Sequence, residues 1–108
     1  MLYNTKLKEL DEKYEADIKK IDDDEIKSIG DIRNQYISSI QPLLVEYNTM
    51  LVEGKDASSI RNQIDQQLTS MKNSIATEQQ KANDARQKAN DALNKSKKEA
   101  EVNYKKKL

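Results

Sequence analysis

The chain of 108 residues contains no cysteine, no histidine, no tryptophan and no phenylalanine. Without cysteine it can form no disulfide, no thiolate metal site and no cysteine nucleophile. Without histidine it lacks the usual general base and the commonest metal ligand. From these absences we expect a protein that is not an enzyme and that uses neither a metal nor another cofactor.

Turn-forming residues are also scarce, with two glycines and one proline in the whole chain. A β-sandwich, a barrel or a repeated βαβ fold needs many more turns, so the composition favours long helices. No apolar run approaches the ~20 residues of a membrane-spanning helix. No apolar signal-peptide segment follows Met1, so we expect a cytoplasmic or virion-associated protein rather than one exported by the general secretion pathway.

Apolar residues recur every three or four positions through residues 3–51, which is the period of one helical stripe. They fall into three rows with a spacing of eleven, and tyrosine fills one of these rows except at Glu25. The rows are Leu10, Ile21, Ile32 and Leu43; Leu7, Ile18, Ile29, Ile40 and Leu51; and Tyr3, Tyr14, Tyr36 and Tyr47. A repeat of eleven averages ~3.67 residues per turn, so the stripe stays almost straight. Glu25 predicts a polar layer that fixes the register.

The second half of the chain follows a spacing of seven, with small residues at many of the repeated positions. One row contains Ile64, Met71, Glu78, Ala85 and Ala92, and the other contains Leu68, Ile75, Ala82 and Ala89. Alanine lets a partner helix approach closely but buries little apolar surface, at ~25 cal/mol per Å². We therefore expect large residues opposite the alanines.

The one convincing break lies at residues 53–56. Gly54 suits the left-handed position after a helix, and Asp56 suits the N-cap of the next helix. The sequence thus predicts an all-α fold, a single long antiparallel helical hairpin of the coiled-coil type over residues 1–108, with arms at about 3–53 and 57–106. Residue i then faces approximately residue 108 − i, which places isoleucines of the first arm opposite the alanines. The alternative is one continuous helix in a parallel oligomer.

Pro42 disturbs the first arm, because proline cannot donate a hydrogen bond to the carbonyl four residues earlier. The apolar stripe nevertheless stays in phase from Ile40 to Leu43. We therefore expect a kink near Pro42 rather than the end of a helix.

The charges cancel overall, with nineteen basic and nineteen acidic residues. The acidic run Asp22–Glu25 does not suit a metal ion, because consecutive helical residues point ~100° apart. We interpret it as a solvated face. Three lysines, Lys105–Lys107, suit the C-terminal end of a helix, and weak nucleic-acid binding through them is the alternative.

Near the turn the first arm is too apolar for one partner helix. Its apolar arc spans ~220° on a helical wheel, whereas a surface helix buries only a little over ~100°. We therefore predict that Ile37, Leu44, Val45 and Val52 are buried against another protein molecule, either a second hairpin in a bundle or a different partner.

About a hundred residues folded as a hairpin resembles the WXG100 proteins in architecture. Their turn contains Trp-x-Gly, where this chain has Val52-Glu53-Gly54, and Tyr104 is followed by lysines instead of their Tyr-x-x-x-Asp/Glu pattern. The resemblance implies a helical adaptor or chaperone of a secretion or tail-assembly pathway. The main hypothesis is a non-enzymatic structural or assembly protein that presents its hairpin to protein partners. Small helical rods rich in Asn, Lys and Ile are common among phage virion components, which favours a multicopy role.

Overall fold

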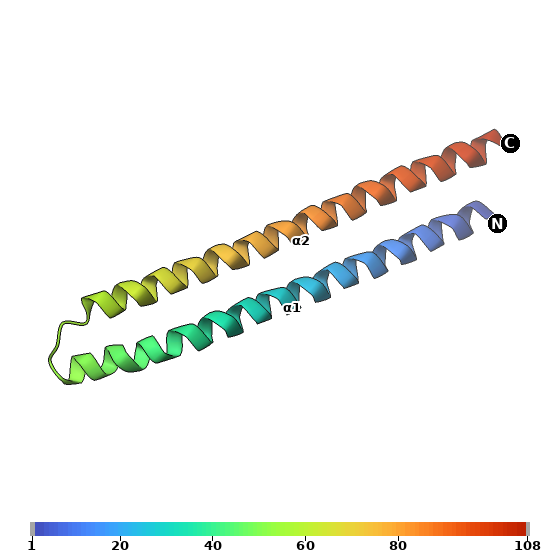
Figure 1. Ribbon diagram of the computed structural model, residues 1–108. Helices are drawn as coiled ribbons and strands as arrows, with labels where there is room; N and C mark the ends of the chain where they lie inside the picture. Colours follow the sequence, from blue (N-terminus) through green and yellow to red (C-terminus); the bar gives the residue numbers. More distant parts are fainter. Residues whose placement is uncertain (1, 108) are drawn as a thin grey trace. The chain divides into compact units, whose positions relative to one another are not determined.

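The computed structural model of the protein describes residues 2–107, which form two long α-helices and no strand. Helix α1 spans Leu2–Val52 and helix α2 spans Ser58–Lys106, joined by a short connection (Figure 1). The predicted all-α antiparallel hairpin is confirmed. By their contacts the residues fall into two units. The turn unit is Ile26–Gln79, and the terminal unit combines the chain up to Glu25 with the chain from Gln80 onward.

The core of the turn unit consists of three isoleucines, Ile40, Ile60 and Ile64, which are nearly inaccessible to solvent. Four half-buried residues pack against them, namely Tyr36, Leu43, Tyr47 and Met50. The Tyr36 hydroxyl also lies 3.4 Å from the Ser74 hydroxyl across the pair of helices. The rows of eleven thus supply the inward face of α1 here, as the sequence predicts.

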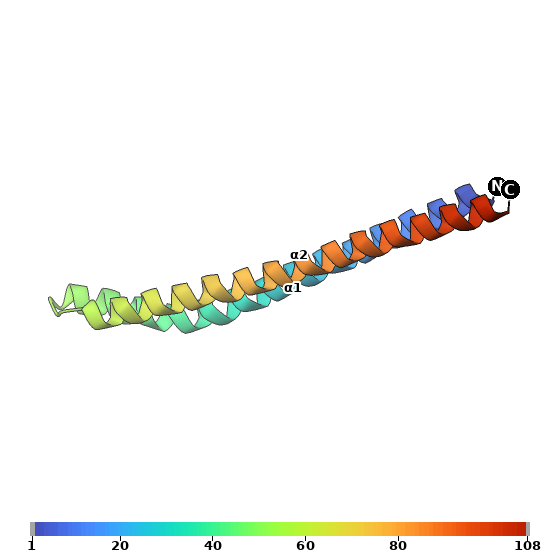
Figure 2. The same cartoon turned by 90° about the horizontal axis from the view of Figure 1, so that it is seen from above.

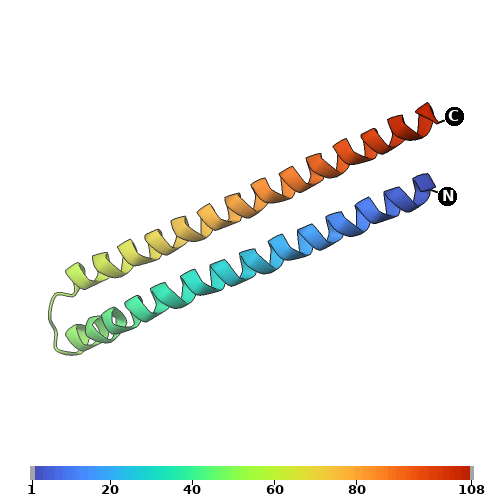
Figure 3. The ribbon, with the colours of Figure 1, turned by 45° about the vertical axis from the view of Figure 1, so that its right-hand side comes forward.

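Helix α1 continues through Pro42 without interruption. Figures 2 and 3 show that the axis of α1 changes direction between its teal stretch and its green end, which leads to Val52. A proline inside a helix is a common cause of such a bend, because it removes one backbone hydrogen bond and crowds the preceding turn.

The end of α1 is a Schellman motif centred on Gly54. The Gly54 N–H donates to the Leu51 carbonyl over 3.1 Å, and the Lys55 N–H donates to the Met50 carbonyl over 2.9 Å. Gly54 has φ 70°, a left-handed conformation that costs an L-residue ~1–2 kcal/mol and glycine almost nothing.

The start of α2 is capped by Asp56. Its Oδ1 accepts hydrogen bonds from the Ser58 N–H over 3.0 Å and from the Ser58 hydroxyl over 2.5 Å. Both bonds lower the pKa of Asp56, and the bond from the Ser58 hydroxyl has the larger effect. The Ala57 carbonyl accepts the first backbone bond of the helix, from Arg61, so Asp56 caps α2 from one residue before the formal N-cap.

In the terminal unit, contacts between the helices follow the predicted register. The rings of Tyr3 and Tyr104 stack with their centroids 4.7 Å apart and their planes at 22°. Lys97 Nζ lies 2.7 Å from Asp11 Oδ1. Each pair joins residue i to a residue close to 108 − i, as the predicted register requires.

The predicted spacing of seven in the second arm is wrong at two positions. It places Leu68 and Ala92 on the inward face, but both are exposed. The inward face of α2 instead follows a spacing of eleven, through Ile60, Met71, Ala82 and Leu93, all of them buried or half-buried. Two helices in continuous contact share one packing geometry, so α2 adopts the period of the apolar rows of α1.

Candidate functional site

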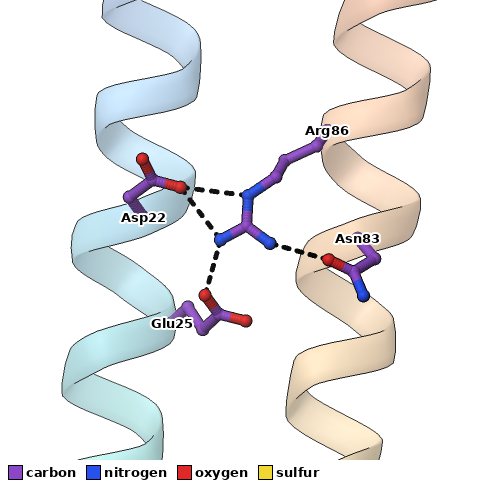
Figure 4. Close-up of polar contacts among 4 residues, drawn as sticks. All are labelled: Asp22, Glu25, Asn83 and Arg86. Atoms are coloured by element: carbon purple, nitrogen blue, oxygen red, sulfur yellow. Dashed lines mark hydrogen bonds and ion pairs between the residues drawn. The ribbon is translucent and has the colours of Figure 1, made fainter.

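A polar layer crosses the terminal unit at Arg86 (Figure 4). The Arg86 guanidinium donates to Asp22 Oδ1 from Nε over 3.0 Å and to Glu25 Oε1 from a terminal nitrogen over 2.5 Å. Its other terminal nitrogen donates to the Asn83 side-chain oxygen over 2.9 Å. Arg86 on α2 thereby binds two carboxylates on successive turns of α1. A lysine cannot reproduce this geometry, because its single ammonium group lacks the planar fork of donors of arginine.

The polar layer is partly shielded from solvent. The side chains of Arg86 and Glu25 are 29% and 19% exposed, while that of Asp22 is 48% exposed. The hydrogen bond to Glu25, followed by that to Asp22, raises the pKa of Arg86. A cation bridging two anions at a half-buried position favours one alignment of the helices over others, because any shift separates the charges.

The sequence pointed to Glu25 as a polar layer but did not identify Arg86. The register places residue 83 opposite Glu25, and Asn83 does contribute to the layer, while Arg86 reaches it from one turn further along α2. The acidic run is divided, since Asp22 and Glu25 bind Arg86 while Asp23 pairs with Lys19 at 2.9 Å. Within residues 2–107 no group of three acidic side chains is placed to hold a metal ion.

The second candidate surface is the set of apolar side chains predicted to meet a partner, called here the apolar face. In the structure Ile37 is 47% exposed, Leu44 44%, Val45 66% and Val52 89%. All four lie on α1 within the turn unit and are exposed to solvent. The structure thus leaves this surface accessible, which is the condition that binding to another molecule requires.

Charge is nearly absent from the part of α1 that carries the apolar face. Glu46 is the only charged residue among residues 34–52, although charged residues make up 35% of the chain. Depletion of charge marks the central part of protein interfaces. Among the described residues 2–107, no helix is both long and apolar enough to span a membrane.

Comparisons with known proteins give no relative from which a role can be transferred. No protein family, no curated protein and no solved structure matches the chain.

Proposed function

We propose that this protein is a non-enzymatic structural or assembly component that binds protein through the apolar face of α1. The observation that carries the proposal is the exposure of Ile37, Leu44, Val45 and Val52 within a stretch that is almost free of charge. A group of large apolar side chains on one side of a helix is typical of a protein-binding site, whereas single exposed apolar residues are ordinary.

The small core of the hairpin supports this proposal. Five apolar residues in the described chain are buried, and two of these five are alanines. No side chain in residues 2–107 is completely shielded from solvent. A pair of helices gains little stability from so little burial, so docking of the apolar face against another protein would add apolar contacts that the hairpin alone lacks.

The composition favours a multicopy component of a phage virion or a similar particle as the setting for this role. An adaptor or chaperone of a secretion or tail-assembly pathway would use the same surface but would release its client afterwards. Stoichiometry separates these two roles, because a structural component stays in the assembled particle in many copies.

The double substitution Leu44→Lys with Val52→Lys tests the proposal. Two ammonium groups in a buried interface should abolish self-association or capture of a specific protein, because each charge would lose its hydration. Helical content should stay nearly unchanged, since both positions are exposed in the hairpin. The measurements are sedimentation of the pure protein and affinity capture from extracts of its source cells, with the captured protein identified.

The matched control is Gln35→Lys with Ser39→Lys, which adds the same charge to exposed positions on the other side of α1. This control should sediment and capture like the natural protein. If the Leu44 and Val52 double variant also sediments and captures like the natural protein, the apolar face is not a binding site and the proposal is wrong.

A further inference from the structure

The exposed side of α1 carries a second regular pattern, which shares only the exposed Leu51 with the rows of eleven. Along it apolar and amide residues alternate with steps of three and four, which we call the outer seam: Asn34, Ile37, Gln41, Leu44, Asn48 and Leu51. All six residues are exposed in the structure. Steps of three and four that repeat every seven residues are the pattern of a helix that packs along another helix in a left-handed coiled coil.

The direction in which the outer seam points suits a bundle. At ~100° per residue, the seam lies roughly 100° around α1 from the side that packs against α2. This is close to the right angle between the two neighbours of a helix in a four-helix bundle. Helix α1 therefore has one side occupied by α2 and a second side shaped for another helix.

We propose that the outer seam binds the outer seam of a second copy of this protein, with the two α1 helices parallel and in register. This inference rests on the proposed function, because it names the partner of the same surface. In a parallel pair in register each position meets its own copy, so Leu44 packs on Leu44 and Gln41 meets Gln41. Reversing one helix would instead bring amides beside leucines and isoleucines, and would leave the amides without polar partners.

The absence of charge along the seam supports pairing of identical helices. A parallel pair in register brings each charge close to its own duplicate, which is repulsive, and only one residue that flanks the seam is charged. On one flank lie Ser38, Val45 and Val52. On the other lie Ile40 and Tyr47 of the intramolecular core and the charged residue, Arg33, at the end of the seam away from the turn. The turn unit as a whole contains five basic and six acidic residues, so it has no charge bias that would select an oppositely charged partner.

Alternating amides give this arrangement its specificity. Amide groups at core positions of a coiled coil lower its stability but select one register and one oligomeric state. Three amides at successive heptads, at Asn34, Gln41 and Asn48, therefore indicate a modest affinity with a strictly defined alignment.

Disulfide trapping tests the alignment directly, because the chain has no cysteine of its own. Three separate variants of the full protein carry Ile37→Cys, Leu44→Cys or Leu51→Cys, and Ser39→Cys on another side of α1 is the control. A disulfide requires Cα atoms within about 7 Å, so only positions that meet their own copy crosslink efficiently. We expect all three seam variants to form covalent dimers at least about tenfold faster than the control.

The outcomes separate the inference from the proposed function. Trapping at all three seam positions, together with a dimer in sedimentation, supports the parallel pair. Trapping at only one of the three indicates an antiparallel or shifted pair and overturns the parallel alignment. Equal trapping in Ser39→Cys overturns the choice of surface. If the protein is monomeric and no variant is trapped, while the Leu44 and Val52 lysine variant loses a captured protein, the second copy is wrong and the proposed function stands.

The amides have their own test. In a background with Gln41→Leu and Asn48→Leu, association should become tighter by about tenfold or more, because buried leucines replace buried amides. When the Ile37→Cys and Leu44→Cys variants are mixed in this background, disulfides between the two different positions should become as frequent as those between identical positions. Unchanged association in this background would place the two amides outside the interface and overturn the assignment of the seam.

Discussion

The two glycines of the chain should respond in opposite ways to replacement by alanine. Gly54 has φ 70°, whereas Gly30 lies inside α1, and a Cβ added at either position would meet no atom within 4 Å. Steric contact therefore contributes nothing at either site, and the backbone conformation alone decides the sign of the effect. The comparison tests whether the chain turns at Gly54.

The magnitudes follow from the conformations. Alanine at position 54 must adopt a left-handed conformation at a cost of ~1–2 kcal/mol, partly offset by ~0.4–1 kcal/mol of lost freedom in the unfolded chain. We expect Gly54→Ala to lower the free energy of unfolding by about 1 kcal/mol. Gly30→Ala should raise it by about 0.5–1 kcal/mol, because alanine is the better helix former.

Urea unfolding followed by far-ultraviolet circular dichroism measures both changes, and Gly54→Asn is the control, since asparagine tolerates the left-handed conformation better than alanine. Its loss should be smaller than that of Gly54→Ala. If Gly54→Ala instead stabilises the protein as much as Gly30→Ala does, residue 54 is helical. The chain would then be one continuous helix, and the hairpin would be wrong.

Three further perturbations address the packing, the polar layer and the cap. Ala82→Leu should overpack the buried side of α2 and cost ~1–3 kcal/mol, whereas Ala92→Leu at an exposed position should change stability by less than about 0.5 kcal/mol. An equal cost at both positions would support the spacing of seven, which places both alanines inward. Arg86→Lys should lower the melting temperature, because lysine cannot bind both carboxylates in the same way. In 1 M salt the melting temperatures of the variant and the natural protein should lie closer together. An unchanged melting temperature would show that the polar layer contributes nothing to stability. The pKa of Asp56 is lower in the folded chain than in the unfolded chain, so the ionised Asp56 carboxylate stabilises the fold. This stabilisation is complete above the unfolded pKa of about 4 and is lost as the pH falls through the folded pKa. Asp56→Asn should therefore weaken the loss of stability in acid, as measured by melting at several pH values, and an identical pH profile would contradict the cap.

The inward face of α1 could be predicted from the sequence because large residues mark it. Isoleucine, leucine and tyrosine at a spacing of eleven leave one side of the helix for burial, and the structure buries or half-buries these rows except at Leu51, near the turn. The turn could also be predicted from the sequence, because glycine is strongly preferred at the left-handed position after a helix, as at Gly54, and aspartate near the start of the next helix, as at Asp56.

The inward face of α2 was harder to predict because small and polar residues occupy much of it. Gln67, Ser74 and Glu78 are half-buried there, while Leu68 is exposed, so hydrophobicity alone does not distinguish a spacing of seven from one of eleven. The predicted register places Arg86 opposite Asp22, and the structure pairs these two residues, but the acidic run was interpreted as a solvated face and the pair was not predicted. The bond from Arg86 to Glu25 is harder to predict, because the long arginine side chain reaches a carboxylate one turn away from the residue that faces it.

The distance between the two ends of the chain tests the hairpin most directly. Spin labels on Asn4→Cys and Asn103→Cys, in a chain with no other cysteine, flank the stacked rings of Tyr3 and Tyr104. Dilution with unlabelled protein removes distances between different molecules. With helices packed ~8–10 Å apart, the hairpin predicts a separation of about 20 Å between the labels. A separation on the order of 150 Å, as expected for one continuous helix with a rise of 1.5 Å per residue, would contradict the hairpin.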